Sequence, residues 1–218
     1  MSVRRLWIVF IYSLLTLPSS AQGFNYNVGG GPGFPLSKTS DFAKTSYHFV
    51  AGAGPNLHSH VKLNAEFMFH GLPVQPSIIK QLGLSDAKGR SNAKGRLYSL
   101  TGNLMLGSEL GLDKSAYLIG GGGWYWRTVE AKHTVLQAGA KCEQGWLWWD
   151  IQCVNGVFPT NVTVGSRTLS AGGFNVGGGL TFRLGDSGAN LYTEVRYHRA
   201  FTRNIETSVL PLTIGVRW

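Results

Sequence analysis

The stretch Val209-Leu-Pro-Leu-Thr-Ile-Gly-Val-Arg-Trp218 decides the fold of this chain. Every second residue in it is apolar, namely Leu210, Leu212, Ile214, Val216 and Trp218. A period of two predicts a β-strand with one apolar and one polar face, because successive side chains of a strand point to opposite sides. Two structures fit this pattern: a half-buried strand of a soluble sheet, or the closing strand of a membrane barrel. The rest of the sequence has to decide between them.

The composition favours a membrane. The chain has 218 residues, which is typical of one domain, and only 14% of them are charged, whereas an average soluble protein has about 25%. After Gln22 no apolar stretch approaches the ~18 residues that a membrane helix needs. A membrane protein with this sequence would therefore cross the bilayer with strands.

The N-terminus has the features of a secretory signal peptide. Arg4 and Arg5 precede an apolar run, Leu6–Leu17, and small residues follow at Ser19 and Ala21. The run is shorter than the ~20 residues of a spanning helix, so we predict cleavage after Ala21. The sequence thus divides into a signal peptide, 1–21, and one β-barrel domain, 22–218. Removing the two arginines lowers the formal net charge from +9 to +7.

The two cysteines, Cys142 and Cys153, are expected to form a disulfide. Export implies an oxidising compartment, which favours a disulfide over two free thiols. A metal site would need more ligands than this pair offers, so no metal is predicted here.

The mature sequence contains eight candidate strands. We expect them at 24–33, 46–54, 61–70, 97–106, 116–128, 174–184, 191–198 and 209–218. Their lengths match strands that cross a bilayer when tilted. In the strand 116–128, the run Gly120–Gly123 blurs the alternation, and we favour an outward direction for Leu118, Trp124 and Trp126.

The breaks between these strands alternate in length. Long breaks are expected at 35–45, 71–95 and 129–167, and short ones at 55–60, 107–115, 185–189 and 201–206. An up-and-down barrel explains the alternation, because its long loops lie at one end and its tight turns at the other. The predicted fold class is therefore all-β, an eight-stranded antiparallel up-and-down transmembrane β-barrel.

The charged residues of the strands fall opposite the apolar positions. This polar set comprises Lys62, Glu66, His70, Arg183, Glu194, Arg196, His198 and Arg217. Charged side chains near the bilayer midplane cost a few kcal/mol when they face lipid, about 2–4 kcal/mol for Arg or Lys, so we expect them to face the lumen. Since an eight-stranded barrel is filled by side chains, opposite charges there can pair.

With these features in place, the mature chain resembles the small bacterial outer-membrane β-barrels, the OmpA transmembrane-domain, OmpX and OmpW-like group. The resemblance rests most specifically on the alternating apolar residues that end in Trp218, a position where phenylalanine is commoner in that group. It implies an outer-membrane location with both chain ends in the periplasm. It also implies that the barrel assembly machinery reads the residues Leu210, Leu212, Ile214, Val216 and Trp218 as an assembly signal. Pro211 departs from the pattern, since proline removes a ladder hydrogen bond.

The break 129–167 is the best candidate for a binding surface. It holds both cysteines together with Trp146, Trp148 and Trp149. A disulfide-closed loop rich in tryptophan is typical of an interaction site for an extracellular ligand. Alternatively, the tryptophans belong to the aromatic girdle of the membrane interface. The sequence leaves both interpretations open.

The second long break is basic, with Lys80, Lys88, Arg90, Lys94 and Arg96. These residues either contact lipopolysaccharide phosphates or form a solvated loop, and the second interpretation is favoured.

Neither Gly29–Gly33 nor Gly120–Gly123 precedes a helix start, as a phosphate-binding loop requires. We therefore expect outer-membrane lipid as a partner, but no nucleic acid and no cofactor.

Two carboxylate–histidine pairs share strand faces, Glu66 with His70 and Glu194 with His198. An enzyme would also need a nucleophile at the same level, and the sequence does not indicate one. We therefore expect no catalysis, and a structural or surface-interaction role with a lumen plugged by polar side chains. The alternatives are a narrow channel for small solutes and an outer-membrane lipid-modifying enzyme.

Overall fold

The structure is a computed structural model that describes residues 23–81, 91–111, 113–144, 151–185, 188–203 and 206–218. The predicted signal peptide, 1–21, lies outside these residues, and its cleavage stays a prediction.

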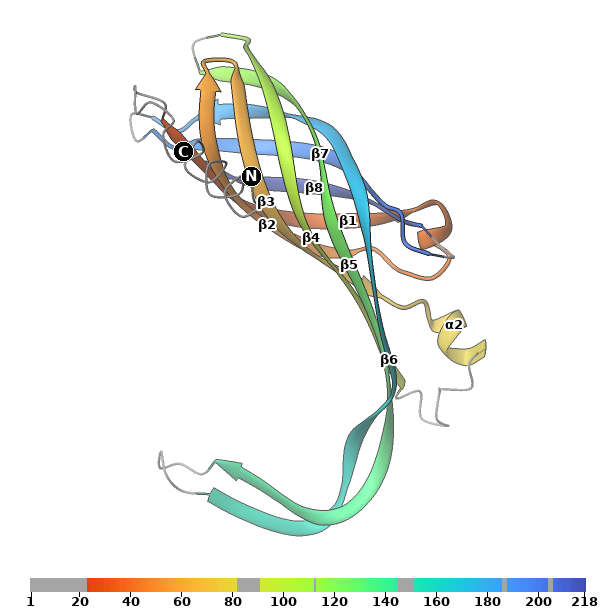
Figure 1. The fold of residues 1–218 in the computed structure, drawn as a ribbon. Helices are drawn as coiled ribbons and strands as arrows, with labels where there is room; N and C mark the ends of the chain where they lie inside the picture. Colours follow the sequence, from red (N-terminus) through yellow and green to blue (C-terminus); the bar gives the residue numbers. More distant parts are fainter. Residues whose placement is uncertain (1–22, 82–90, 112, 145–150, 186–187, 204–205) are drawn as a thin grey trace, which may run out of the picture.

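Eight antiparallel strands close into a barrel in sequence order (Figure 1). They are β1 (Phe24–Leu36), β2 (Ser46–His58), β3 (Val61–Pro73), β4 (Ser91–Glu109), β5 (Lys114–Gln144), β6 (Ile151–Arg183), β7 (Asn190–Ala200) and β8 (Thr207–Arg217). The ring closes because β1 pairs with β8, with Val28 opposite Val216. Closure leaves the barrel without open sheet edges, and the predicted fold class is confirmed.

The connections divide the barrel into two ends. The terminal end carries both ends of the described chain and the short β2–β3, β4–β5 and β6–β7 connections. The other end, here called the hairpin end, carries the 3-10 helix η1 (Ser37–Thr39), the helix α2 (Pro76–Gln81) and the β5–β6 hairpin. Neither helix is long and apolar enough to cross a membrane; in the described part of the chain no such helix exists. The β1–β2 and β3–β4 connections of the hairpin end are longer than the connections of the terminal end, as predicted, whereas the β7–β8 connection, 201–206, is short although it lies at the hairpin end.

The β5–β6 hairpin corrects the prediction of a loop over 129–167. The two strands pair continuously from Lys114 opposite Phe182 to Gln144 opposite Ile151, with one register shift at Ala131/Lys132. They leave the barrel as a curved two-stranded ribbon (Figure 1). The reason lies in the many β-branched residues on both sides, such as Val135 opposite Thr160, which favour extended pairing. Trp146, Trp148 and Trp149 fall outside the described residues.

β4 is also longer than predicted. It begins at Ser91 instead of Leu97, and Ser91 lies opposite His133 of β5. The long β5 strand offers a pairing partner beyond the barrel wall, so β4 continues along it. Part of the basic break, including Lys94 and Arg96, is therefore strand.

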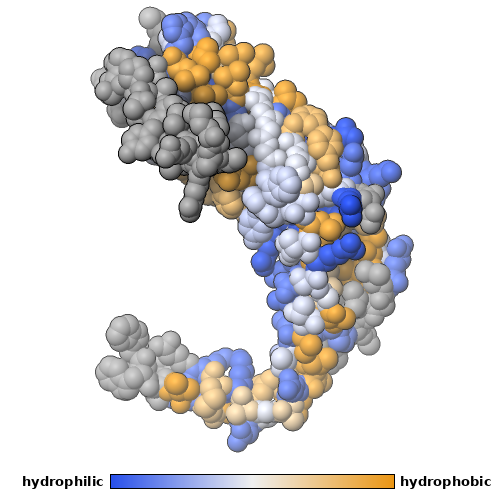
Figure 2. All heavy atoms as spheres, in the orientation of Figure 1, coloured by the Kyte–Doolittle hydropathy of each residue, from blue (hydrophilic) through white to orange (hydrophobic). Residues whose placement is uncertain are grey.

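The outer surface of the barrel is apolar. In Figure 2, apolar side chains (orange) gather on this face of the barrel, and hydrophilic ones (blue) become more frequent where β5 and β6 leave it. Leu118 is 69% exposed and Trp124 50%, whereas their neighbours Tyr117 and Tyr125 are buried. Despite its glycines, β5 therefore keeps the outward direction that we favoured.

Aromatic side chains form a girdle at each end of this apolar surface. At the terminal end, the ring of Tyr26 lies 5.5 Å from that of Phe24 and 6.2 Å from that of Trp218. At the hairpin end, Phe69 lies 5.8 Å from Tyr47 and 5.4 Å from Tyr98. Two aromatic girdles around an apolar band are the signature of a barrel in a bilayer.

The C-terminal stretch forms half of the closing seam. Tyr26 N donates to Trp218 O (2.8 Å), and Trp218 N donates to Tyr26 O (3.0 Å). Leu212, Ile214 and Trp218 are exposed on the outer surface. The alternation that opened the sequence analysis is therefore lipid-facing, although its role as an assembly signal remains a prediction.

Candidate functional site

A buried ion-pair cluster occupies the middle of the lumen. Arg196 of β7 lies between Glu66 of β3 and Glu194 of β7. Its Nε donates to Glu194 Oε1 at 2.8 Å, and its Nη1 contacts Glu66 Oε2. All three residues are at most 3% exposed. Burying a charge costs several kcal/mol unless the charge is paired, so each of these residues depends on its partner. The pair of Glu66 with Arg196 links β3 to β7 across the lumen.

A shell of neutral hydrogen-bond donors surrounds Glu66. Asn27 Nδ2 and Asn64 Nδ2 donate to Glu66 Oε1 at 3.1 and 2.9 Å. Asn103 Nδ2 donates to Glu66 Oε2 at 2.6 Å, and Asn103 in turn accepts from Asn175 at 2.8 Å. Connected hydrogen-bond networks of this kind rigidify a core. Glu66 is therefore held from β1, β3, β4 and β7.

The second carboxylate, that of Glu194, is also hydrogen-bonded by a neutral donor in addition to Arg196. Tyr117 OH donates to Glu194 Oε2 at 2.9 Å. Beside the cluster remains a cavity of only about 10 Å³, about the smallest space that admits one water molecule. At this level, the described side chains fill the lumen.

The three buried histidines, His48, His70 and His198, lie on the hairpin side of the cluster. His198 Nδ1 is 3.1 Å from Tyr125 OH, and His48 Nε2 is 2.9 Å from Thr213 Oγ1. The ring of His70 stacks on that of His48 at 6.2 Å between centroids and packs against the backbone of Gly33. The carboxylates of Glu66 and Glu194 are hydrogen-bonded to other groups instead. The two carboxylate–histidine pairs of the sequence thus do not come into contact within the described residues.

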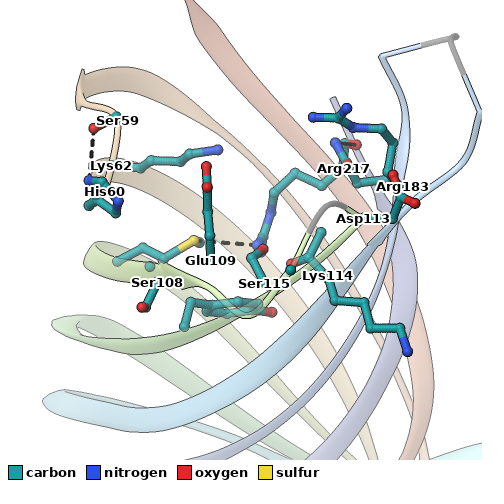
Figure 3. Close-up of a pocket in the computed structure, with 16 residues that line it drawn as sticks. Ser59, His60, Lys62, Ser108, Glu109, Asp113, Lys114, Ser115, Arg183 and Arg217 are labelled. Atoms are coloured by element: carbon teal, nitrogen blue, oxygen red, sulfur yellow. Dashed lines mark hydrogen bonds between the residues drawn. The ribbon is translucent and has the colours of Figure 1, made fainter.

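A vestibule opens at the terminal end of the lumen (Figure 3). It has a volume of about 790 Å³, and strands β3 to β8 contribute to its wall. Arg217 forms part of its inner surface, with Lys62 on one side and Arg183 at the rim. The guanidinium of Arg217 lies 4.7 Å from the ring centroid of Tyr117 and 4.6 Å from that of Tyr192, in cation–π contact with both.

The predicted polar set thus separates into three groups along the lumen. Glu66, Glu194 and Arg196 form the central cluster, and Arg217 approaches it, with Nη2 3.9 Å from Glu194 Oε2. His70 and His198 are buried toward the hairpin end. Lys62 and Arg183 lie near the terminal ends of their strands and line the vestibule, so they do not join the central ion pairs.

Sequence reasoning missed the neutral half of this network. The missed residues are Asn27, Asn64, Asn103, Asn175, Tyr117, Tyr125, Tyr192 and His48. Each lies on the inward face of its strand. Alternation predicts the inward direction of residues such as Asn64, Asn103 and Asn175, but a neutral side chain on that face does not by itself indicate a bond to a carboxylate.

The predicted disulfide is present. Cys142 and Cys153 are opposite each other in the β5–β6 pairing and are joined by a disulfide. It lies close to the tip of the hairpin, far along the chain from the barrel wall.

His58 and His60, near the β2–β3 turn, have their ring centroids 6.5 Å apart. Within the described ranges, no three His, Cys, Asp or Glu side chains group closely enough to hold a metal ion.

Solved structures with this fold come from several bacteria. Neisserial surface protein A is similar with a TM-score of 0.55 and 10% identity over 89% of this chain and 95% of that chain. A major outer membrane protein from Thermus thermophilus has a TM-score of 0.53 and 10% identity, over 91% of this chain and 98% of that chain. The attachment invasion locus protein Ail of Yersinia pestis, in complex with the heparin analogue sucrose octasulfate, has a TM-score of 0.50 and 11% identity. That similarity covers 90% of this chain and 99% of Ail.

No protein-family model matches the sequence, and no curated protein matches it. At 10–11% identity these similarities concern the fold and not the role. The closed ring of eight strands, the apolar band between two aromatic girdles and the solved structures agree with one another. The chain has the fold of the small outer-membrane β-barrel proteins.

Proposed function

We propose that this protein is a closed outer-membrane barrel that displays the β5–β6 hairpin at the cell surface as an interaction platform. The observation that carries the proposal is the hairpin itself. β5 and β6 run together to Gln144 and Ile151, whereas their barrel neighbours β4 and β7 stop pairing with them at Ser91 and Ala200. The part of the ribbon beyond the barrel does not contribute to the barrel wall. We infer that it makes contacts outside the membrane.

The hairpin has the features of a binding surface. Beyond the barrel, exposed apolar side chains are interspersed with polar ones on both strands; Leu136, Val154 and Val157 are between 62% and 68% exposed. Among the described residues, none pairs with the outer backbone edges of either strand beyond the β4 and β7 pairings. Open edges can accept an extended segment of another protein by strand addition. The extracellular ligand itself remains unidentified.

The orientation of the barrel follows from its connections. Outer-membrane barrels have short turns in the periplasm and long loops outside. We therefore place the terminal end, with both chain ends, in the periplasm and the hairpin outside.

Protease treatment of intact cells tests this orientation. Trypsin should cleave after Lys141, whose side chain is 57% exposed near the hairpin tip, because the tip would be accessible from the medium. The fragments are identified by mass spectrometry, and cells with a permeabilised outer membrane serve as the control. Cleavage at Lys141 only after permeabilisation would place the hairpin in the periplasm and refute the proposal.

We also propose that lipopolysaccharide contacts the barrel just outside the girdle of the hairpin end. On β4, Lys94 and Arg96 are exposed, and they share the outward face of Tyr98. Their cationic groups would lie at the level of the phosphates, where charge attraction is effective. Lys80 is exposed at the end of α2, whereas Lys88 and Arg90 lie outside the described residues.

The double variant Lys94→Gln/Arg96→Gln tests this contact. We expect weaker binding of purified lipopolysaccharide to the refolded protein, by roughly 30-fold, since each of the two basic residues near an anionic surface contributes about 1 kcal/mol. The variant Lys38→Gln/Lys44→Gln, in the β1–β2 connection, is the matched control for net charge. Equal binding by the two double variants would contradict a localised contact.

The proposed role includes no catalysis and no conducting pore. The carboxylates of the lumen are engaged by Arg196, Tyr117 and asparagines, which supports a structural role for them. The vestibule favours a channel as the second candidate, because it opens the lumen at one end. The central cluster opposes a channel, since an ion would have to break buried ion pairs to pass.

A further inference from the structure

We propose that the vestibule at the terminal end is a binding site for a phosphate monoester, with Arg217 and Lys62 as its anion-binding residues. This inference goes beyond the surface role proposed above and does not depend on which compartment the terminal end faces. It rests on three observations: an unsatisfied buried arginine, an excess of positive charge and a cavity of ligand size.

The first observation is the incomplete hydrogen bonding of Arg217. Its side chain is 4% exposed, yet Nε and Nη2 have no hydrogen-bond partner in the described structure. The carboxylate oxygen of Glu194 stays 3.9 Å from Nη2, beyond hydrogen-bond distance. Nη1 donates only to the thioether sulfur of Met105, at 3.3 Å, and a thioether is a weak acceptor. A buried cationic donor without an acceptor is costly, and an anionic oxygen would satisfy it.

The tyrosines fix this guanidinium in place. Tyr117 and Tyr192 lie on it with centroid distances of 4.7 and 4.6 Å, which restricts the planar group to one orientation. Guanidinium groups suit phosphate oxygens, and the two rings hold this one at the inner surface of the vestibule.

The second observation is the charge of the vestibule wall. Four cationic side chains line it, namely Lys62, Lys114, Arg183 and Arg217, together with two carboxylates, Glu109 and Asp113. With the histidine neutral, the described lining carries a formal net charge of +2, four positive charges minus two negative ones. Among the described residues, none of these cations forms an ion pair with either carboxylate of the wall. Arg217 also lies 3.9 Å from Glu194 of the central cluster, so the other lining residues leave a positive charge of +1, three cations minus two carboxylates, which attracts a phosphate monoester with a charge near −2.

The third observation is the size and polarity of the cavity. A volume of about 790 Å³ lies in the range of small-molecule sites, roughly 300–1,000 Å³, and exceeds what a phosphate ion alone would fill. Ser59, Ser108 and Ser115 add hydroxyl groups to the wall. In Figure 3 the side chains of Lys62 and Arg217 extend from opposite sides toward the middle of this space. An organic phosphate therefore fits better than the bare ion.

Isothermal titration of the refolded full chain in an uncharged maltoside detergent tests the proposal, since such a detergent carries no phosphate. Glycerol 3-phosphate is the probe, inorganic phosphate separates the organic ester from the free ion, and glycerol is the neutral control. We expect binding of glycerol 3-phosphate, weaker binding of inorganic phosphate and no binding of glycerol.

Three variants make the test specific. Lys62→Gln should weaken binding of glycerol 3-phosphate about tenfold or more, because it removes a charged hydrogen bond. Glu109→Gln should strengthen it, because it removes a competing carboxylate from the wall. Lys44→Gln, an equal charge change in the β1–β2 connection, should leave it unchanged.

Some results would overturn the proposal. These are the absence of binding at about 10 mM probe, and equal affinities in the wild type and all three variants. If Lys62→Gln fails to refold, as judged by its gel mobility without boiling, Arg183→Gln at the rim replaces it with the same expected direction. Inorganic phosphate binding as tightly as the ester would refute the assignment to an organic phosphate.

Discussion

At the scale of single residues, Arg196 is the centre of the lumen. Its guanidinium pairs with both Glu66 and Glu194, and Arg217 lies 3.9 Å from Glu194 as the second nearby cation. The Asn side chains around Glu66 complete its hydrogen bonding but carry no charge. The stability of the barrel interior thus depends more on this one cation than on any neutral neighbour.

The variant Arg196→Met tests this dependence. We expect a loss of about 3–5 kcal/mol in the free energy of unfolding, because removal of one partner leaves buried charges uncompensated. Urea unfolding of the refolded protein in lipid vesicles measures it. The matched control is Arg199→Met, three positions along β7, whose ion pair with Glu206 is 40% and 50% exposed and should contribute little. Equal stability of the two variants would contradict a central role for Arg196.

At the scale of elements, the β5–β6 hairpin differs from the rest of the sheet. In the barrel each strand has two neighbours, whereas beyond the pairings of Ser91 and Ala200 the described part of each hairpin strand pairs only with the other. A two-stranded ribbon is marginally stable by itself. The disulfide Cys142–Cys153 lies where this support is weakest, so it should stabilise the tip and not the barrel.

Replacement of both cysteines by serine separates these effects. The disulfide joins residues 11 apart in sequence, and closing so short a loop contributes about 3 kcal/mol. Amide hydrogen exchange in the hairpin beyond the barrel should therefore accelerate, by on the order of 100-fold. Exchange in β1, β7 and β8 should stay the same, and it serves as the internal control. A parallel acceleration in these barrel strands would show that the hairpin and the barrel unfold as one unit.

The same elements explain what the sequence can predict. Alternation identified all eight strands within the barrel, because successive residues of a barrel strand face lipid and lumen in turn. The run Gly120–Gly123 obscured which residues of β5 face the lipid, since glycine has no side chain that shows an apolar or a polar face. The hairpin was missed because outside the membrane neither face of a strand must be apolar, and Val135 or Thr160 can then occur in a loop or in a strand.

The interior of the site was predicted only in part. Charged residues such as Glu66 and Arg196 stand out in a strand, so their inward direction could be inferred. Which carboxylate pairs with which cation depends on barrel closure and on strand tilt, and these bring Glu66 close to a residue 130 positions away. Lys62 points into the lumen like Glu66, but it lies at the vestibule and not at the central cluster. Alternation predicts which side of the wall a residue faces, but not its height along the barrel axis.

At the scale of the whole molecule, the barrel is open at the terminal end and filled in the middle. The vestibule of about 790 Å³ narrows to a cavity of about 10 Å³ beside the central cluster. A hydrated ion entering from the terminal end would meet Arg217 and then the pairs of Arg196 with two glutamates. These buried pairs support the proposal that the barrel is a scaffold for its outer elements, with a lumen that is closed at the level of the cluster.

Conductance in a planar lipid bilayer tests this central claim most directly. The refolded protein is inserted at constant voltage, and single-channel current is recorded with the Arg196→Met variant alongside. For the wild type, our account predicts no steady open state, because the buried pairs of Arg196 with Glu66 and Glu194 close the lumen. A reproducible, long-lived conductance step for the wild-type protein would contradict the closed barrel and favour a channel.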